Sequence, residues 1–153
     1  MRNYKKLPIC TIAIAAANVL IFLGLSFMGM TEDSAFMMEH GAMYVPYLMN
    51  GERYYTLITS MFLHFGFSHL MNNMVMLLVI GYSLEPEIGK IRFLLIYFGS
   101  GLMGNLVSAW FDVSQGSYAV SAGASGAIFG IVGALLYVAI RNYGRVGEIS
   151  TRG

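Results

Sequence analysis

Hydrophobic residues along this chain form four long blocks, and polar residues gather in the segments between them. The blocks cover residues 9–30, 68–84, 93–111 and 120–140. A helix needs about 20 mostly apolar residues to cross the hydrocarbon core of a bilayer. The pattern therefore predicts four membrane-spanning helices. The second block supports its helix least, because it is short and contains Asn72 and Asn73.

The composition excludes an ordinary soluble domain. Hydrophobic residues make up 57% of the chain and charged residues 11%, against about 45–50% and 25% in soluble domains. A single cysteine, Cys10, rules out an intrachain disulfide, and three histidines without a Cys/His cluster indicate no metal. The net charge of +1 comes with no basic patch. We therefore expect the lipid bilayer as a partner, and no nucleic acid, metal or cofactor.

The first hydrophobic block has an alternative interpretation as a cleavable signal peptide. Arg2, Lys5 and Lys6 precede it, and Ala13-Ile14-Ala15 resembles a cleavage site. Cleavage there would leave too short an apolar region, whereas the block continues to Met30. A membrane anchor is the better interpretation.

The basic residues predict the orientation. Of the nine Lys and Arg residues, eight fall on one side of a four-span model and one on the other. The eight are Arg2, Lys5, Lys6, Lys90, Arg92, Arg141, Arg145 and Arg152, and the ninth is Arg53. Cytoplasmic loops carry the excess of basic residues. We therefore expect residues 1–8 and 141–153 in the cytoplasm, 9–140 as the membrane domain and 31–67 as an outer loop.

Three polar residues at one depth carry the candidate chemistry. Ser125 stands between small neighbours inside the fourth block, about 7–8 Å below its outer start at 1.5 Å per residue. His69 and Asn73 open the second block and, four residues apart, face the same way on a helix. Polar groups at membrane depth indicate a functional site. The alternatives are a serine bonded to its own helix, a packed histidine, and asparagines that join helices.

Glycines mark where the helices should pack closely. Gly123, Gly126, Gly130 and Gly133 leave bare patches on the fourth block, and Gly99, Gly101 and Gly104 do the same on the third. Small residues let membrane helices approach each other. We therefore expect a neighbouring helix to lie close to Ser125.

In this order and spacing, the polar residues and their neighbours resemble the rhomboid intramembrane serine proteases, over roughly residues 51–143. The matching features are Gly51-Glu52-Arg53, the loop from Leu57 to His64, His69-x-x-x-Asn73, Glu85, Gly123-Ala124-Ser125-Gly126 and Phe129. The resemblance implies that Ser125 is the nucleophile and that His69, Asn73 and the Ser125 backbone N–H form the oxyanion hole. Gly123, Gly126, Phe129 and Glu85 would support the site, and Arg53 and His64 would have structural roles.

The same resemblance implies an all-α polytopic bundle that cleaves transmembrane proteins near their outer ends, without a cofactor, in a prokaryotic-type plasma membrane. Rhomboids have at least six spans and carry the general-base histidine on the sixth. Here His40, His64 and His69 all precede Ser125. We therefore expect a rhomboid core cut short after the fourth span, with no general base and no activity alone. A non-proteolytic rhomboid-like protein that binds membrane clients and an unrelated small transporter or scaffold remain the alternatives.

Overall fold

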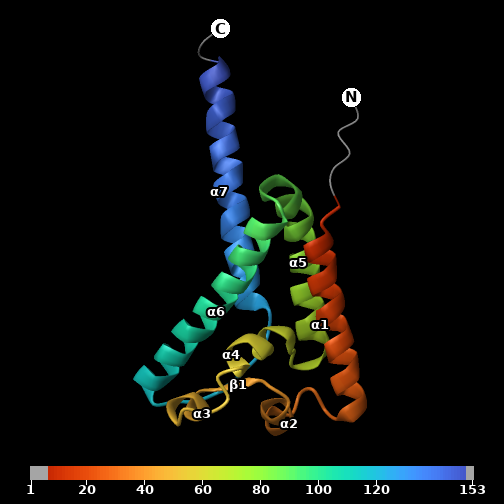
Figure 1. Cartoon of the computed structure of the whole chain (residues 1–153), viewed down its shortest axis with the longest axis vertical. Coiled ribbons are helices and arrows are strands. Elements are labelled where there is room, and N and C mark those ends of the chain that lie inside the picture. Colours follow the sequence, from red (N-terminus) through yellow and green to blue (C-terminus); the bar gives the residue numbers. More distant parts are fainter. Residues whose placement is uncertain (1–6, 151–153) are drawn as a thin grey trace.

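Four long helices dominate the computed structural model, which describes residues 7–150, with side chains to Tyr143. They are α1 (Ile9–Met28), α5 (Gly66–Ile88), α6 (Lys90–Gln115) and α7 (Ser125–Ser150). Successive long helices run in opposite directions, and the short elements gather at one end (Figure 1). Each long helix is apolar and long enough to cross a membrane. The prediction of an all-α polytopic bundle with four such helices is therefore confirmed.

The fourth hydrophobic block does not begin as a helix. Val120 and Ser121 form the short strand β2, and α7 starts only at Ser125. The helical depth of 7–8 Å expected for Ser125 is therefore wrong, because the residues before it are not helical. Gly123 has a φ of +131°, which an α-helix does not allow. Ser125 instead lies at the very start of its helix.

The connection between α1 and α5 is folded rather than extended. It contains α2 (Ser34–Glu39), β1 (Met43–Tyr44), α3 (Val45–Met49), α4 (Thr56–Thr59) and the 3₁₀ helix η1 (Ser60–Phe62). The Asp33 carboxylate caps α2, because its Oδ1 accepts from the N–H groups of Ala35 at 2.7 Å and Phe36 at 3.1 Å. Strand β1 pairs antiparallel with β2, with Met43 opposite Ser121. This pairing ties the connection to the segment that leads into α7.

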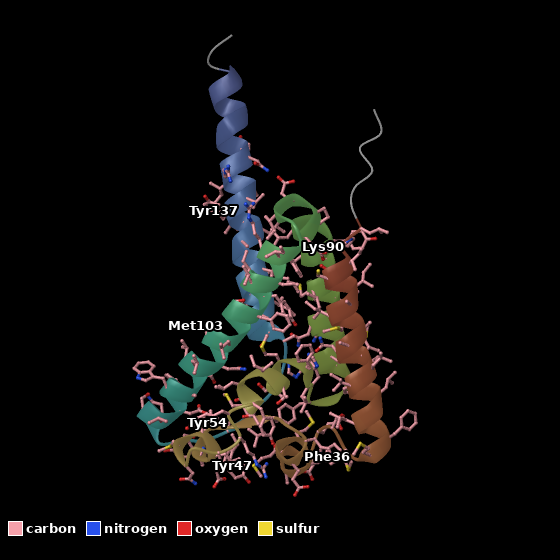
Figure 2. The ribbon with its side chains drawn as sticks, viewed as in Figure 1. Phe36, Tyr47, Tyr54, Lys90, Met103 and Tyr137 are labelled. Atoms are coloured by element: carbon pink, nitrogen blue, oxygen red, sulfur yellow. The ribbon has the colours of Figure 1, made fainter. Side chains whose placement is uncertain are left out.

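The connection also carries many aromatic side chains. Phe36, Tyr47 and Tyr54 lie at one end of the molecule, and Lys90 lies well away from them (Figure 2). The Arg53 guanidinium lies 4.3 Å from the centre of the Tyr47 ring, and its Nη1 donates to the Met38 carbonyl at 3.1 Å. Arg53 thus holds two parts of the connection together, as expected for a structural role.

Glycines bring α6 and α7 together. A Cβ placed on Gly104 would lie 3.4 Å from the Cα of Gly126, and one on Gly126 would lie 3.8 Å from the Cα of Gly101. Gly99 and Gly133 have no neighbour within 4 Å of such a Cβ. The expected glycine packing therefore occurs near Ser125 but not along the whole of either helix.

Glu85 holds α1 against α5 at the end of the fold away from Ser125. Its Oε1 accepts from the Cys10 N–H at 2.9 Å, and its Oε2 accepts from the Thr11 N–H at 2.7 Å and the Thr11 hydroxyl at 2.8 Å. The first turn of a helix has N–H groups without helical partners, and here a carboxylate from another helix takes them. Glu85 is twelve residues beyond Asn73 on α5, about 18 Å at 1.5 Å per residue. Its support is therefore to the fold and not to the site directly.

Candidate active site

His69 lies one turn inside α5, where the start of the helix fixes its ring. Its Nδ1 accepts a hydrogen bond from the N–H of Phe65, the residue before the helix, at 3.3 Å. Because a backbone N–H can only donate, Nδ1 must carry the lone pair. The proton of the neutral ring is therefore on Nε2, which makes Nε2 a hydrogen-bond donor.

The Nε2 edge of His69 rests against the turn before Ser125. A Cβ on Gly123 would lie 2.8 Å from His69 Cε1 and 2.9 Å from Nε2, so any other residue would force the His69 ring to shift. The positive φ of Gly123 gives a second, independent reason for glycine. The Gly123 N–H donates to the Ser60 carbonyl at 2.9 Å. Gly123 thus allows the serine turn and the histidine to come into contact.

Replacing Gly123 by alanine is expected to lower the free energy of unfolding by about 1–3 kcal/mol, the range for a strained backbone conformation, with the clash against His69 adding to that strain. Gly133→Ala is the matched control, because Gly133 is helical and has open space around it. Alanine there should be neutral or slightly stabilising. Denaturant unfolding of both variants in detergent measures the difference. Equal stability of the two would show that the Gly123 turn is not constrained.

Asn73 follows His69 by one turn on the same face of α5. Its side-chain Nδ2 donates to the His69 carbonyl at 2.9 Å. An amide nitrogen has two hydrogens, so one remains for another acceptor. A cavity of about 170 Å³ joins Asn73 to Ser125. The cavity is lined by Asn72, Asn73, Met76, Ser125, Ile128, Phe129 and Val132.

Ser125 is exposed and stands at the N-terminus of α7. No hydrogen bond of its hydroxyl occurs within the part of the chain that the structure describes. The alternative of a hydroxyl bonded one turn back has no helical carbonyl to use, because the helix starts at this residue. The free N–H groups and positive dipole end of a helix favour negative charge at this position. A second cavity of about 370 Å³, lined by Asn105, Ser108 and Ser121 among others, also reaches Ser125.

The structure thus brings together most of the predicted site residues. His69 and Ser125 both lie close to Gly123, Asn73 and Ser125 line one cavity, and Gly126 packs on α6. Phe129 is exposed at the rim of the smaller cavity, and Glu85 lies elsewhere. The sequence predicted a structural role for His64 but did not connect it with the turn before Ser125, and Ser60 was not predicted at all. The available signal for His64 was a polar residue directly after the apolar run Met61-Phe62-Leu63.

Comparison with known families decides what kind of protein carries this site. The rhomboid domain matches residues 51–152 of the chain. The chain belongs to the rhomboid family. With its four apolar helices, this rhomboid is an integral membrane protein. The family resemblance seen in the sequence is therefore confirmed, and an unrelated transporter or scaffold is excluded.

Individual relatives give a mixed picture of activity. Rhomboid protease GluP of Bacillus subtilis (strain 168) is 38% identical over 135 residues, which are 88% of this chain and 25% of that protein. RHOMBOID-like protein 5 of Arabidopsis thaliana is 52% identical over 93 residues, 61% of this chain and 29% of that protein. Inactive RHOMBOID-like protein 8 of the same plant is 35% identical over 123 residues, 80% of this chain and 34% of that protein. No solved structure gives a significant match. The chain spans about a quarter to a third of the length of these relatives.

None of the three histidines in these 153 residues is placed as a base for Ser125. His40 is bonded through Nδ1 to the Phe36 carbonyl at 2.7 Å, in the outer loop. His64 Nε2 accepts a hydrogen bond from the Ala124 N–H at 3.5 Å. His69 would have to move its proton to Nδ1 and break the bond from Phe65 before Nε2 could accept one. The geometry therefore makes His69 a donor.

Proposed function

We propose that this rhomboid is an intramembrane serine endopeptidase. The observation that carries the proposal is the exposed hydroxyl of Ser125 at a helix N-terminus, with Asn73 and the Nε2–H edge of His69 beside it. In the proposed reaction, Ser125 Oγ attacks the peptide carbonyl carbon and gives its proton to a base. The carbonyl oxygen becomes an oxyanion, which accepts from His69, Asn73 and the Ser125 N–H. Proton transfer to the departing amine breaks the peptide bond, and water then hydrolyses the acyl-enzyme.

The substrate class follows from where the site lies. His69 and Asn73 are in the first two turns of α5, and Ser125 starts α7. Both helices thus present the site near the end of the fold that carries the outer loop. With the excess of basic residues in the cytoplasm, this end faces outward. The expected substrates are transmembrane proteins, cleaved near their outer ends, and the expected location is a plasma membrane of prokaryotic type with the N-terminus inside.

The proposed reaction needs a general base, and the three histidines of these 153 residues are engaged otherwise. We therefore expect the 153 residues by themselves to be inactive. The second candidate function is a non-proteolytic rhomboid that binds membrane clients. The relative named as inactive favours it. Against it, a protein that only binds has no need of a serine, a histidine and an asparagine held around one point.

The test is cleavage of membrane-anchored reporters by the protein expressed from its natural start to its natural stop. Reporters with the cleavable sequence at the outer end of their span should be cut, and those with it at the inner end should not. Asn73→Ala should lower turnover by about 10²-fold, as loss of an oxyanion donor does. The matched control is Asn72→Ala, because Asn72 lines the same cavity but is exposed. Binding of reporters without any cleavage would favour the non-proteolytic alternative.

A further inference from the structure

His64 is a buried histidine that the proposed reaction does not use. It follows η1, and only 1% of its surface is exposed. The ring lies against two parts of the site, the residue before Ser125 and the ring of His69. We propose that His64, as a neutral imidazole, is the positioning residue that holds the serine turn and the oxyanion histidine in one fixed arrangement. This inference rests on the proposed function and names a further residue of the same site.

The first contact orients the backbone that leads into Ser125. The Gly123 N–H donates to the Ser60 carbonyl at 2.9 Å, and the next N–H, that of Ala124, donates to His64 Nε2 at 3.5 Å. The outer loop therefore holds two successive N–H groups. The next N–H along the chain belongs to Ser125 and is the one that the proposed reaction directs at the oxyanion. Because the Gly123 and Ala124 N–H groups are held, the direction of the Ser125 N–H is fixed as well.

The second contact limits the motion of His69. The centres of the His64 and His69 rings are 5.1 Å apart, with the planes at 71°. Aromatic rings favour this edge-to-face arrangement. The Phe65 N–H holds the His69 ring through a hydrogen bond to Nδ1. The His64 ring packs against the His69 ring and limits its rotation. Rotation of His69, which would carry Nε2 away from the serine turn, is thereby opposed from two directions.

The first contact requires the neutral form of His64. An imidazolium has no lone pair on Nε2 and could not accept from Ala124. The pKa of His64 is lowered from its ordinary 6.5 to about 4, chiefly by burial and also by the neighbouring His69, while the backbone of Phe62 opposes the shift. The groups that face His64 are thus His69 from α5, the Ala124 N–H from the turn before α7, and the Phe62 backbone from η1. His64 is therefore neutral near pH 7, with its proton on Nδ1.

This arrangement can be tested without any activity, because the chain has only three histidines. Histidine-selective ¹⁵N NMR of the 153-residue chain in detergent reports which ring nitrogen carries the proton. At pH 7 we expect the proton on Nδ1 of His64 and on Nε2 of His69. His64 should stay neutral as the pH falls toward 4. A proton on Nε2 of His64, or a charged His64 at pH 6, would overturn the proposal.

Two variants separate positioning from a merely structural role. His64→Phe keeps a flat ring but removes the acceptor, and His64→Gln keeps a side-chain acceptor. We expect the His69 signals to become heterogeneous in His64→Phe and to remain close to those of the parent in His64→Gln. His40→Gln, which changes a histidine of the outer loop away from Ala124, is the control. Unchanged His69 signals in His64→Phe would contradict the inference.

Cleavage by the natural-length protein provides the second readout. A catalytic group displaced by about 1 Å can cost as much as 10²-fold in rate, so His64→Phe should lower kcat at least tenfold while KM stays unchanged. His64→Gln should recover most of kcat. If the NMR result holds but the parent cleaves nothing, the proposed protease function fails and the arrangement around His64 stands. If the parent and His64→Phe cleave equally well, the positioning role is wrong.

Discussion

Replacing Ser125 by alanine is expected to lower reporter cleavage by the natural-length protein by about 10⁶-fold, the loss seen when a serine protease loses its nucleophile. The physical reason is that no other group at this point can form the acyl-enzyme. The oxyanion donors remain, and they can still supply roughly 10³-fold over the uncatalysed reaction in water. That residual rate is too small for an ordinary assay, so cleavage should be undetectable.

The matched control is Ser121→Ala. Ser121 carries a hydroxyl on β2, four residues before Ser125, and lines the larger of the two cavities that reach it. Ser121→Ala removes one hydroxyl from the lining of this cavity but leaves the proposed nucleophile in place. Cleavage should therefore be retained. Unfolding curves of both variants show whether either has lost its fold. Cleavage by a folded Ser125→Ala protein at the level of the parent would exclude Ser125 as nucleophile.

Much of this fold and site was predictable because the signals are local. A block of about 20 apolar residues needs no partner to be identified as a membrane helix. The spacing of His69 and Asn73 follows from helical periodicity alone. Small residues around Ser125 predicted a close helix neighbour, and Gly101 and Gly104 of α6 provide it. In each case, a short stretch of sequence carries the whole argument.

The features that were not predicted depend on residues far apart in the chain. β2 forms because Val120 and Ser121 pair with Tyr44 and Met43, and that pairing moves the start of α7 to Ser125. The role of His64 depends on its hydrogen bond with Ala124, which lies sixty residues later in the chain. Periodicity and composition describe only neighbours in sequence. The start of α7 and the role of the outer loop therefore required the structure.

Glu85 is the strongest example of such a distant contact, and its loss should have the largest effect on stability. The carboxylate is 2% exposed and accepts hydrogen bonds from Cys10 and Thr11, which begin α1. Pro8, the residue before α1, provides no side-chain cap. Glu85→Ala would leave the Cys10 and Thr11 N–H groups without their partner. We expect the free energy of unfolding to fall by about 4 kcal/mol, because hydrogen bonds to a charged group contribute about 1.5–3 kcal/mol each and their loss leaves the donors unpaired.

Glu87→Ala is the matched control, because Glu87 lies two residues further on the same helix but is exposed and bonds only weakly to Asn142, at 3.4 Å. Glu87→Ala removes the same charge from the same end of the molecule, and the free energy of unfolding should change little. Glu85→Gln keeps one acceptor oxygen but turns an amide NH₂ group toward backbone donors. The decrease in the free energy of unfolding should therefore lie between those of Glu87→Ala and Glu85→Ala. Denaturant unfolding of the parent and the three variants in one detergent gives the order. If Glu85→Ala and Glu87→Ala lowered the free energy of unfolding equally, net charge rather than the capping of α1 would set the stability. The Glu85 carboxylate would then not be what joins α1 to α5.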